Sequence, residues 1–366
     1  MKAEYRKLGE IIELIDERNT DGNVQNLIGV SIDKCFIKSV ANTIGTDLTK
    51  YQVIRKFDFA CSLMQVSRDG KIPIACLRDY DEAIMSPAYY IFRVKNTKEV
   101  LPDYLEMWFM RKEFDREASY IAVGGVRGSM PWEDFCDMKL PVPAIEKQQK
   151  IVDAYNAISK RIQIKQKINE KLEKTAQCLF EEITKDKAKN AELSDIANIT
   201  MGQSPSGDSY NENRIGTIFY QGKTDFGFRF VKERMYTTEP TKYAPEKSIL
   251  ISVRAPVGEI NITTKKCCIG RGLASITSKN NAPSFLFYTL KSMKNQFELF
   301  NGEGTVFGSI NRESLEKLPI IMPSASEIRM LEEKFSVIDD RIYRNDIELD
   351  NLYELRQLLI SRISGM

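Results

Sequence analysis

The residues of this chain that are best suited to chemistry are amides, cations and hydroxyls in short loops that contain glycine. The clearest case is Tyr220-Gln221-Gly222-Lys223. A glutamine can pair with the edge of adenine, a lysine can bind guanine or a phosphate, and a glycine allows close approach. The same residue types dominate polar turns, so the segment has two interpretations, a DNA contact and an ordinary β-turn.

Other polar residues extend this candidate site. Arg254 follows an apolar, strand-like run, and it fits a buried ion-pair partner as well as a cation that reads a DNA groove. Arg271 stands between two glycines, where ordering a guanidinium is costly unless a ligand receives it. In the first half, Val30–Lys34 is the counterpart by position, with Ser31 and Lys34 as candidates. Loops before two predicted long helices add four candidate phosphate contacts: Arg127, Ser129, Ser309 and Asn311.

The residues that are missing exclude several kinds of catalysis. The chain has no histidine, which removes the usual Ser-His and Cys-His pairs and the usual zinc sites. There is no Walker A sequence, no Asn/Asp-Pro-Pro-Tyr/Phe segment and no glycine-rich cofactor loop after a strand. The seven cysteines show no CxxC spacing, which indicates reduced thiols in a cytosolic protein. We therefore expect no metal and no cofactor in this chain.

Hydrophobic periodicity predicts a mixed α/β globule in each half. Strands are predicted in the first half at Leu27–Ile32, Gln52–Ile54, Phe59–Val66, Ile72–Leu77 and Ala88–Val94, followed by a helix over Leu101–Tyr120. In the second half we expect strands at Ser248–Val253 and Cys267–Ile276 and a helix at Phe285–Leu299. Alternation in the strand that begins at Cys267 predicts one of Cys267 and Cys268 inside and the other outside.

Two stretches carry the steps of four and three residues that are typical of a coiled coil. The residues that we assign to helix pairing are Ile158, Ile162, Asn169, Leu172 and Leu179 in the first stretch, and Ile338, Ile342, Asn345, Leu352 and Leu359 in the second. All of the second set except Asn345 lie 180 positions after a member of the first. The stretch 146–185 has a net charge of +3 and the stretch 326–366 a net charge of −3, which favours pairing with each other. Short connections favour an antiparallel pair, in which Asn169 meets Asn345.

The chain is therefore predicted to be a tandem repeat of a globule followed by a helix. Gly125–Ser129 corresponds to Gly304–Ser309 in the second half, and Lys139–Pro141 corresponds to Lys317–Pro319. The predicted fold class is α+β, with two similar mixed α/β domains joined by two long antiparallel coiled-coil helices around a pseudo-twofold axis. The predicted boundaries are 1–145 for the first domain, 146–185 for the first helix, 186–323 for the second domain and 324–366 for the second helix.

Several motifs resemble those of one known family. They are Gly202–Ser206, Phe219–Phe226, Ile249–Gly258 and Ile269–Leu273 in the second half, and Leu27–Lys34, Ser86–Tyr90 and Met130–Phe135 in the first. These segments resemble the target-recognition domains of type I restriction–modification specificity subunits. The resemblance covers essentially the whole chain, although the chain is short at both ends relative to many members.

The resemblance implies a non-catalytic subunit that reads a bipartite sequence in double-stranded DNA, with the helices as the spacer. Separate modification subunits would bring S-adenosylmethionine and methylate adenine, and a restriction subunit would bring ATP, Mg and translocation. The internal repeat favours two copies of the modification subunit. No run is long and apolar enough for a membrane span, and we expect a cytoplasmic protein.

Two other functions compete with this interpretation. The first is a structural coiled-coil adaptor without a DNA role. A salt-sensitive band shift separates it from a DNA-binding protein, because phosphate contacts weaken steeply with salt. The second is a self-sufficient DNA methyltransferase or nuclease, against which the missing motifs count. Binding of S-adenosylmethionine by the purified chain alone would favour it.

Overall fold

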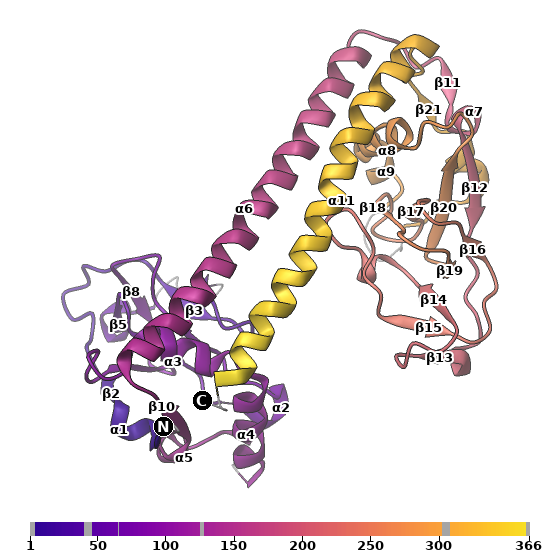
Figure 1. The fold of residues 1–366 in the computed structure, drawn as a ribbon. Coiled ribbons are helices and arrows are strands. Elements are labelled where there is room, and N and C mark those ends of the chain that lie inside the picture. Colours follow the sequence, from indigo (N-terminus) through magenta and orange to yellow (C-terminus); the bar gives the residue numbers. More distant parts are fainter. Residues whose placement is uncertain (1–3, 40–45, 65, 125–127, 302–307, 364–366) are drawn as a thin grey trace. The chain divides into compact units, whose positions relative to one another are not determined.

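A computed structural model describes residues 4–39, 46–64, 66–124, 128–301 and 308–363 (Figure 1). The chain divides into two compact units. The first contains the residues up to 162 and those from 351 onward, and the second contains residues 163–350. Each long helix contributes one part to each unit. No helix in the described ranges has both the length and the apolar composition that a membrane span requires.

The first unit is built on a four-stranded antiparallel sheet in the order β2-β9-β6-β7. Its strands are β2 (Ile12–Ile15), β9 (Tyr90–Val94), β6 (Phe59–Cys61) and β7 (Ile74–Cys76). Three antiparallel pairs accompany it: β1 (Glu4–Lys7) with β10 (Lys139–Val142), β3 (Ile28–Val30) with β4 (Phe36–Lys38), and β5 (Gln52–Arg55) with β8 (Glu82–Met85).

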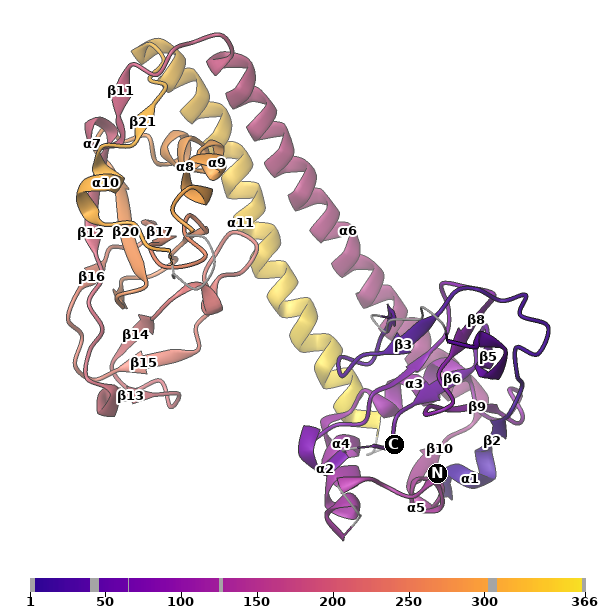
Figure 2. The ribbon, with the colours of Figure 1, turned by 180° about the vertical axis from the view of Figure 1, so that it is seen from behind.

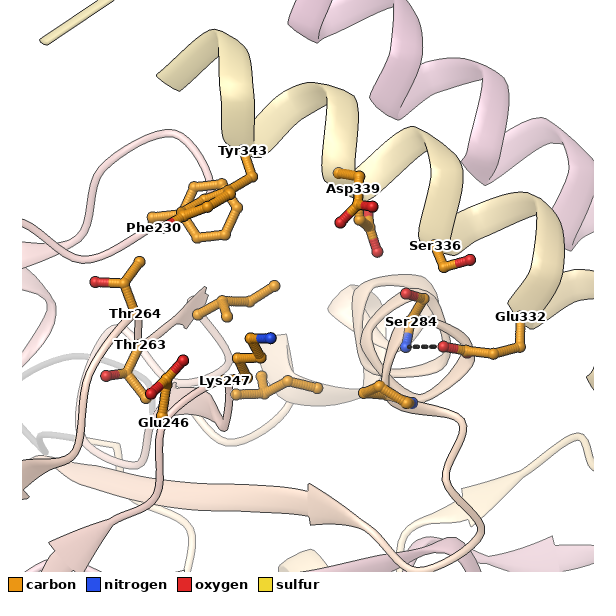
Figure 3. A pocket seen from close by; sticks show the side chains of 14 residues that line it. Phe230, Glu246, Lys247, Thr263, Thr264, Ser284, Glu332, Ser336, Asp339 and Tyr343 are labelled. Atoms are coloured by element: carbon orange, nitrogen blue, oxygen red, sulfur yellow. Dashed lines mark hydrogen bonds between the residues drawn. The ribbon is translucent and has the colours of Figure 1, made fainter. Parts of the chain in front are cut away.

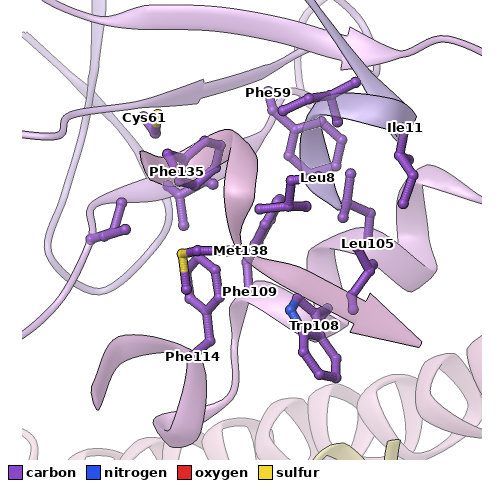
Figure 4. Packing of buried hydrophobic residues seen from close by; sticks show 14 of the residues in the cluster. Leu8, Ile11, Phe59, Cys61, Leu105, Trp108, Phe109, Phe114, Phe135 and Met138 are labelled. Atoms are coloured by element: carbon purple, nitrogen blue, oxygen red, sulfur yellow. The ribbon is translucent and has the colours of Figure 1, made fainter. Parts of the chain in front are cut away.

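Short helices cover this sheet and close an aromatic core. They are α1 (Leu8–Ile11), α2 (Val66–Asp69), α3 (Pro102–Phe109), α4 (Lys112–Ile121), α5 (Trp132–Asp137) and the 3₁₀ turns η1 (Leu48–Lys50) and η2 (Ala122–Gly124). Phe59 stacks on Phe92 with ring centroids 5.3 Å apart, and Phe109 meets Phe59 edge-on at 5.7 Å. Figure 4 shows Phe109, Phe114 and Phe135 gathered around Met138 in this core.

The second unit repeats the same order of elements. Its antiparallel sheet runs β12-β20-β17-β18, made of β12 (Ala197–Met201), β20 (Leu273–Ser278), β17 (Ile249–Ser252) and β18 (Ile260–Ile262). As in the first unit, a strand–helix segment precedes it, here β11 (Ala191–Glu192) and α7 (Leu193–Ile196), and β11 pairs with β21 (Pro319–Ile320). Helices α8 (Pro283–Ser292), α9 (Lys294–Glu298) and α10 (Arg312–Glu316) complete the repeat (Figure 2).

A five-stranded mixed sheet is the distinctive part of the second unit. Its order is β13-β15-β14-β19-β16, and its strands are β13 (Tyr210–Asn211), β15 (Met235–Thr237), β14 (Thr217–Tyr220), β19 (Cys267–Ile269) and β16 (Tyr243–Ala244). The 3₁₀ turns η4 (Gly207–Ser209) and η5 (Lys223–Asp225) flank it. The pair β14 and β19 is parallel, so both strands end at the same edge.

The long helices are α6 (Ile145–Thr184) and α11 (Ala325–Arg362). In the second unit, Asn345 of α11 hydrogen-bonds Asn169 of α6, and Phe335 lies in one core with Phe180 and Ala176. In the first unit, Ile151 near the start of α6 shares a core with Ile363, just past the end of α11. The helices therefore pair antiparallel, and the asparagine bond confirms the predicted register.

The residues assigned to helix pairing are all buried or half-buried, in agreement with a seam. Ile162, Asn169, Ile342 and Asn345 are buried. The half-buried members are Ile158, Leu172, Leu179, Ile338, Leu352 and Leu359. A narrow stripe of this kind shields the polar asparagine pair from water on both sides.

Four predicted elements were wrong in detail. The strand predicted over Phe59–Val66 ends at Cys61, and its last residue begins helix α2. The helix predicted over Leu101–Tyr120 is broken at Met110–Arg111 into α3 and α4, and its counterpart is broken at Met293. The strand predicted over Cys267–Ile276 is two strands, because the close-packed backbone at Gly270–Gly272 turns the chain from β19 into β20.

The prediction for the adjacent cysteines was also wrong. Cys267 and Cys268 are both 0% exposed. Both faces of strand β19 are covered: Cys267 packs with Ile218 and Leu250, and Cys268 lies 3.9 Å from Thr241 Oγ1, so alternation does not separate an inside from an outside. Burial raises the pKa of the Cys267 thiol to about 11, which keeps it protonated and unreactive at neutral pH.

Candidate nucleic-acid interface

Two of the predicted contact segments meet where the parallel strands β14 and β19 end. The amide of Gly270 donates to the carbonyl of Tyr220 at 2.8 Å. A Cβ atom on Gly272 would lie 2.6 Å from the carbonyl oxygen of Gln221, so only glycine permits this approach. Gln221 and Arg271 are therefore held side by side by backbone contacts, although 50 positions separate them in sequence.

A third segment, Gly202–Ser206, joins the same place. The amide of Gln203 donates to Ile269 at 2.9 Å, and the amide of Arg271 donates to Ser204 Oγ at 3.2 Å. A Cβ on Gly202 would lie 2.2 Å from the carbonyl oxygen of Gly270. Three glycine-containing loops thus form one surface, which we call the loop cluster: residues 202–206, 221–223 and 270–272.

The loop cluster presents polar side chains to solvent. Gln203, Gln221, Lys223 and Arg271 are exposed. Within the described residues, neither Lys223 nor Arg271 has an ion-pair partner. Unpaired cations beside exposed amides can bind phosphates and base edges at the same time. Gln203 was not among the predicted contacts, although the motif that contains it was recognised.

Arg254 and Ser309 lie next to this cluster. The amide of Val253 donates to Gly272 at 2.9 Å, and Arg254 follows it in the chain. Arg254 also forms a β-bridge with Ser309. Its side chain is exposed and has no ion pair in the described part of the chain, which excludes the buried-pair interpretation. Arg254 thus extends the cationic surface of the loop cluster.

Burial contradicts two of the predicted contacts, Tyr220 and Lys34, and a further one, Asn311, caps a helix while it stays exposed. Tyr220 is 2% exposed and packs with Ile218 and Leu250, and burial raises the pKa of its hydroxyl. Its ring is therefore part of the core of the second unit and does not face a ligand. The side chain of Asn311 is exposed and caps α10, where its Oδ1 accepts from the amide of Ser314 at 2.8 Å.

The second buried contact is Lys34, in the turn between β3 and β4. Its Nζ donates to Asp115 Oδ1 at 2.8 Å and to the carbonyl of Phe109, and its side chain is 10% exposed. Burial lowers the pKa of this ammonium, opposed by the hydrogen bond to Asp115. Lys34 therefore anchors the hairpin to α4 instead of facing a ligand. Ser31, at the start of the same turn, lies 3.1 Å from Cys35 Sγ.

The first unit has a different surface at the position that corresponds to Arg254. The amide of Met130 donates to Leu63 at 2.9 Å, as the amide of Ile310 donates to Val253 at 3.0 Å. Exposed Met64 therefore replaces Arg254, and half-buried Ser129 replaces Ser309. Arg127, the remaining predicted contact, lies outside the described residues. The two units thus offer different chemistry at matching positions.

A cavity of about 430 Å³ lies in the second unit between α11 and the segment around Phe230 (Figure 3). Its walls include the carboxylates of Glu246, Glu332, Asp339 and Asp340 and only one cation, Lys247. Carboxylates at this density repel phosphate, so the cavity does not belong to a nucleic-acid surface. The described residues contain no cluster of acidic or cysteine side chains that could hold a metal ion.

Comparison with known proteins gives concordant matches. The sequence matches the family model for the type I restriction modification DNA specificity domain over residues 2–174 and 185–354. A Methanocaldococcus jannaschii chain, named as the specificity subunit of type I restriction enzyme MjaX, is 29% identical over 375 residues, covering 93% of this chain and 87% of that one. The type I restriction enzyme HindI specificity subunit of Haemophilus influenzae is 25% identical over 374 residues, covering 78% of this chain and 81% of that one.

A solved structure shares the fold. The S subunit of a type I restriction–modification system from M. genitalium superposes with a TM-score of 0.61 at 13% identity, covering 99% of this chain and 96% of that one. At this identity the likeness concerns the architecture alone. It agrees with two mixed α/β repeats and two long helices.

Proposed function

The chain belongs to the type I restriction modification DNA specificity domain family, and from this premise we propose that each of its two units reads one half of a split DNA target. The family and its curated members are non-catalytic specificity subunits that recognise DNA targets, as the resemblance of the motifs implied. The proposal concerns how this chain distributes that recognition between its units.

The observation that carries the proposal is the loop cluster of the second unit. Three loops far apart in sequence converge by backbone contacts that require glycine, and they expose two glutamines and two unpaired cations. Glutamine supplies bidentate hydrogen bonding to adenine, while lysine and arginine bind guanine or phosphate. In the first unit, Met64 replaces Arg254, which supports recognition of a different half-sequence.

The partners follow from the same reasoning. We propose that two copies of a modification subunit bind the chain, one per repeat, because two similar surfaces within one chain favour two copies of the same partner. S-adenosylmethionine would be bound by those copies, and ATP and Mg by a restriction subunit, with the complex acting on DNA in the cytoplasm. A mass measurement that finds one modification subunit at saturation would contradict the stoichiometry.

Binding measurements on the complex of this chain with its modification subunit test the function. We expect affinity for duplex DNA to fall steeply between low and moderate salt, by roughly 10³-fold or more when six or more phosphates are contacted. A duplex that carries the target should outcompete an unrelated duplex at every salt concentration. Equal affinity for both duplexes would contradict sequence-specific recognition. Affinity that does not change with salt would contradict the phosphate contacts.

A further inference from the structure

Arg229 is the only arginine among the largest fully buried side chains of the described residues. It lies in a hairpin, residues 226–231, which follows the turn η5, and the first residue of that turn, Lys223, belongs to the loop cluster. The hairpin is closed by a bridge between Phe226 and Val231 and by the amide of Gly227, which donates to Phe230 at 3.2 Å. The side chain of Arg229 is 0% exposed, so its charge needs partners in the protein.

Those partners lie on both long helices. Nη1 donates to Asp339 Oδ1 of α11 at 2.6 Å, and Nη2 donates to Glu173 Oε1 of α6 at 3.0 Å. Nη2 also lies 3.0 Å from the hydroxyl of Tyr288, which itself donates to Asp339 at 2.9 Å. The guanidinium stacks 4.1 Å from the ring centroid of Phe287. One side chain thus ties the hairpin to α6, α8 and α11.

The hairpin is equally tied to the loop cluster. The amide of Lys232 donates to the carbonyl of Asp225 in η5 at 2.8 Å, and the carboxylate of Asp225 accepts from Arg234 Nε at 2.8 Å. Lys232 Nζ in turn reaches Asp346 and Asp350 of α11, each at 2.9 Å. The path from Lys223 to α11 is therefore a short chain of hydrogen-bonded residues.

Stability alone does not explain a buried guanidinium at this position. Replacing a buried ion pair with well-packed apolar residues is often neutral or stabilising, because both charges lose their hydration on burial. What the planar guanidinium adds is geometry, since its separate N–H groups fix the directions of two carboxylates at once. A lysine, with one ammonium, cannot hold the two helices in the same way.

We propose that Arg229 is a positioning residue that fixes the DNA-reading loops of the second unit on the two long helices. The second half-site is then read only at a set position along the helix pair, so Arg229 makes recognition sensitive to the number of base pairs between the half-sites. This inference rests on the proposed function. It assigns to Arg229 no contact with DNA.

The test uses the complex of the full chain with its modification subunit and a series of duplexes. All duplexes carry the same two half-sites, and the gap is native, shorter by one base pair or longer by one. The measured quantity is the ratio of the affinity for the native gap to the affinity for each altered gap. For Arg229→Met we expect this ratio to fall roughly tenfold, because the loops lose their fixed attachment. Arg229→Lys should fall between this variant and the natural chain. Discrimination against base changes in the first half-site should stay unchanged.

Lys291→Gln is the matched control. Lys291 on α8 pairs with the same Glu173 carboxylate at 2.5 Å, but it lies outside the hairpin. In this variant, the affinities for the three gap lengths should rank in the same order as in the natural chain. If Arg229→Met weakens all duplexes by one common factor, or keeps the natural ranking, Arg229 is only structural and the inference is overturned.

A folding failure of Arg229→Met does not end the test. In Arg229→Met/Asp339→Asn the cation and one carboxylate are removed together, while Glu173 keeps its pair with Lys291, so no buried carboxylate is left without a cation. Loss of gap preference in this variant supports the inference, and a natural ranking overturns it. Should none of the variants fold, Arg229 is needed for folding itself and the positioning role is rejected. Lack of any sequence preference in the natural chain would instead reject the proposed function.

Discussion

The side-chain amide of Asn345 on α11 donates to the amide oxygen of Asn169 on α6 at 2.7 Å, and both residues are 1% exposed. Lys165 completes the arrangement, since its Nζ donates to Asn345 Oδ1 at 3.0 Å and pairs with Glu348 at 2.6 Å. A displacement of one helix along the other would leave these amides buried without partners. The polar pair therefore selects a single register for the two helices.

The first prediction concerns this pair. Asn169→Leu should lower the free energy of unfolding by about 1–3 kcal/mol, because the Asn345 amide then loses a buried partner. The double variant Asn169→Leu/Asn345→Leu should recover part of that loss, since two leucines pack without polar groups. Urea unfolding of both variants measures the difference. An unchanged free energy in the single variant would mean that water reaches the seam.

The register was predictable because its signal is local. Helix seams repeat every three or four residues, and Asn169 and Asn345 are polar seam positions near the middle of their stretches, which antiparallel pairing about the middle brings together. The burial of Lys34 was not predictable in this way. Its partner Asp115 is 81 positions distant, and only the packing of the β3–β4 turn on α4 brings them together.

The second prediction concerns the loop cluster. Gln221→Ala and Lys223→Ala should each weaken recognition of the second half-site by about 1–3 kcal/mol if each side chain makes a good base contact. The first half-site should be read as before. Competition binding with single-base changes in each half-site measures this, and Lys189→Ala, a charge removed from an exposed linker, is the control. Equal losses on all sequences would make both residues phosphate anchors, and no loss would restore the polar-turn interpretation.

The convergence of the loop cluster was only partly predictable. Each of its three segments was identified from its residue types, but their meeting depends on the parallel pairing of β14 with β19. No short-range pattern encodes that pairing, and the same pairing buries Tyr220. Arg229 carried no signal in the sequence at all, because its partners Glu173 and Asp339 lie 56 and 110 positions distant.

The third prediction treats the helices as a ruler. Insertion of one heptad at matched seam positions of α6 and α11 adds about 10 Å to each helix and preserves the seam. The gap between half-sites in the recognised DNA should lengthen, while both half-sequences stay the same. A heptad inserted in α6 alone is the control, and it should abolish pairing beyond the insertion. Changed half-sequences with an unchanged gap would contradict the ruler.

The fourth prediction is a titration. The carboxylate of Glu327 accepts from Lys187 Nζ at 2.7 Å and from the amide of Ser324 at 2.8 Å, and these bonds lower its pKa to about 2. Because the pKa is lower in the folded chain, this carboxylate stabilises the fold above pH 4.5, and the contribution disappears as the pH falls towards 2. In NMR titrations, Lys187→Ala should raise the pKa of Glu327. An unchanged value would assign the shift to Ser324 alone.

The most direct measurement maps methylated adenines across the genome in cells with and without this gene. We predict one methylated bipartite motif with a fixed gap, which disappears on deletion and returns when the gene is restored. Restoration with Gln221→Ala/Lys223→Ala should return methylation in which only the second half-sequence is relaxed. A bipartite motif that persists without the gene, or that relaxes in its first half with this variant, would contradict the assignment of one half-sequence to each unit.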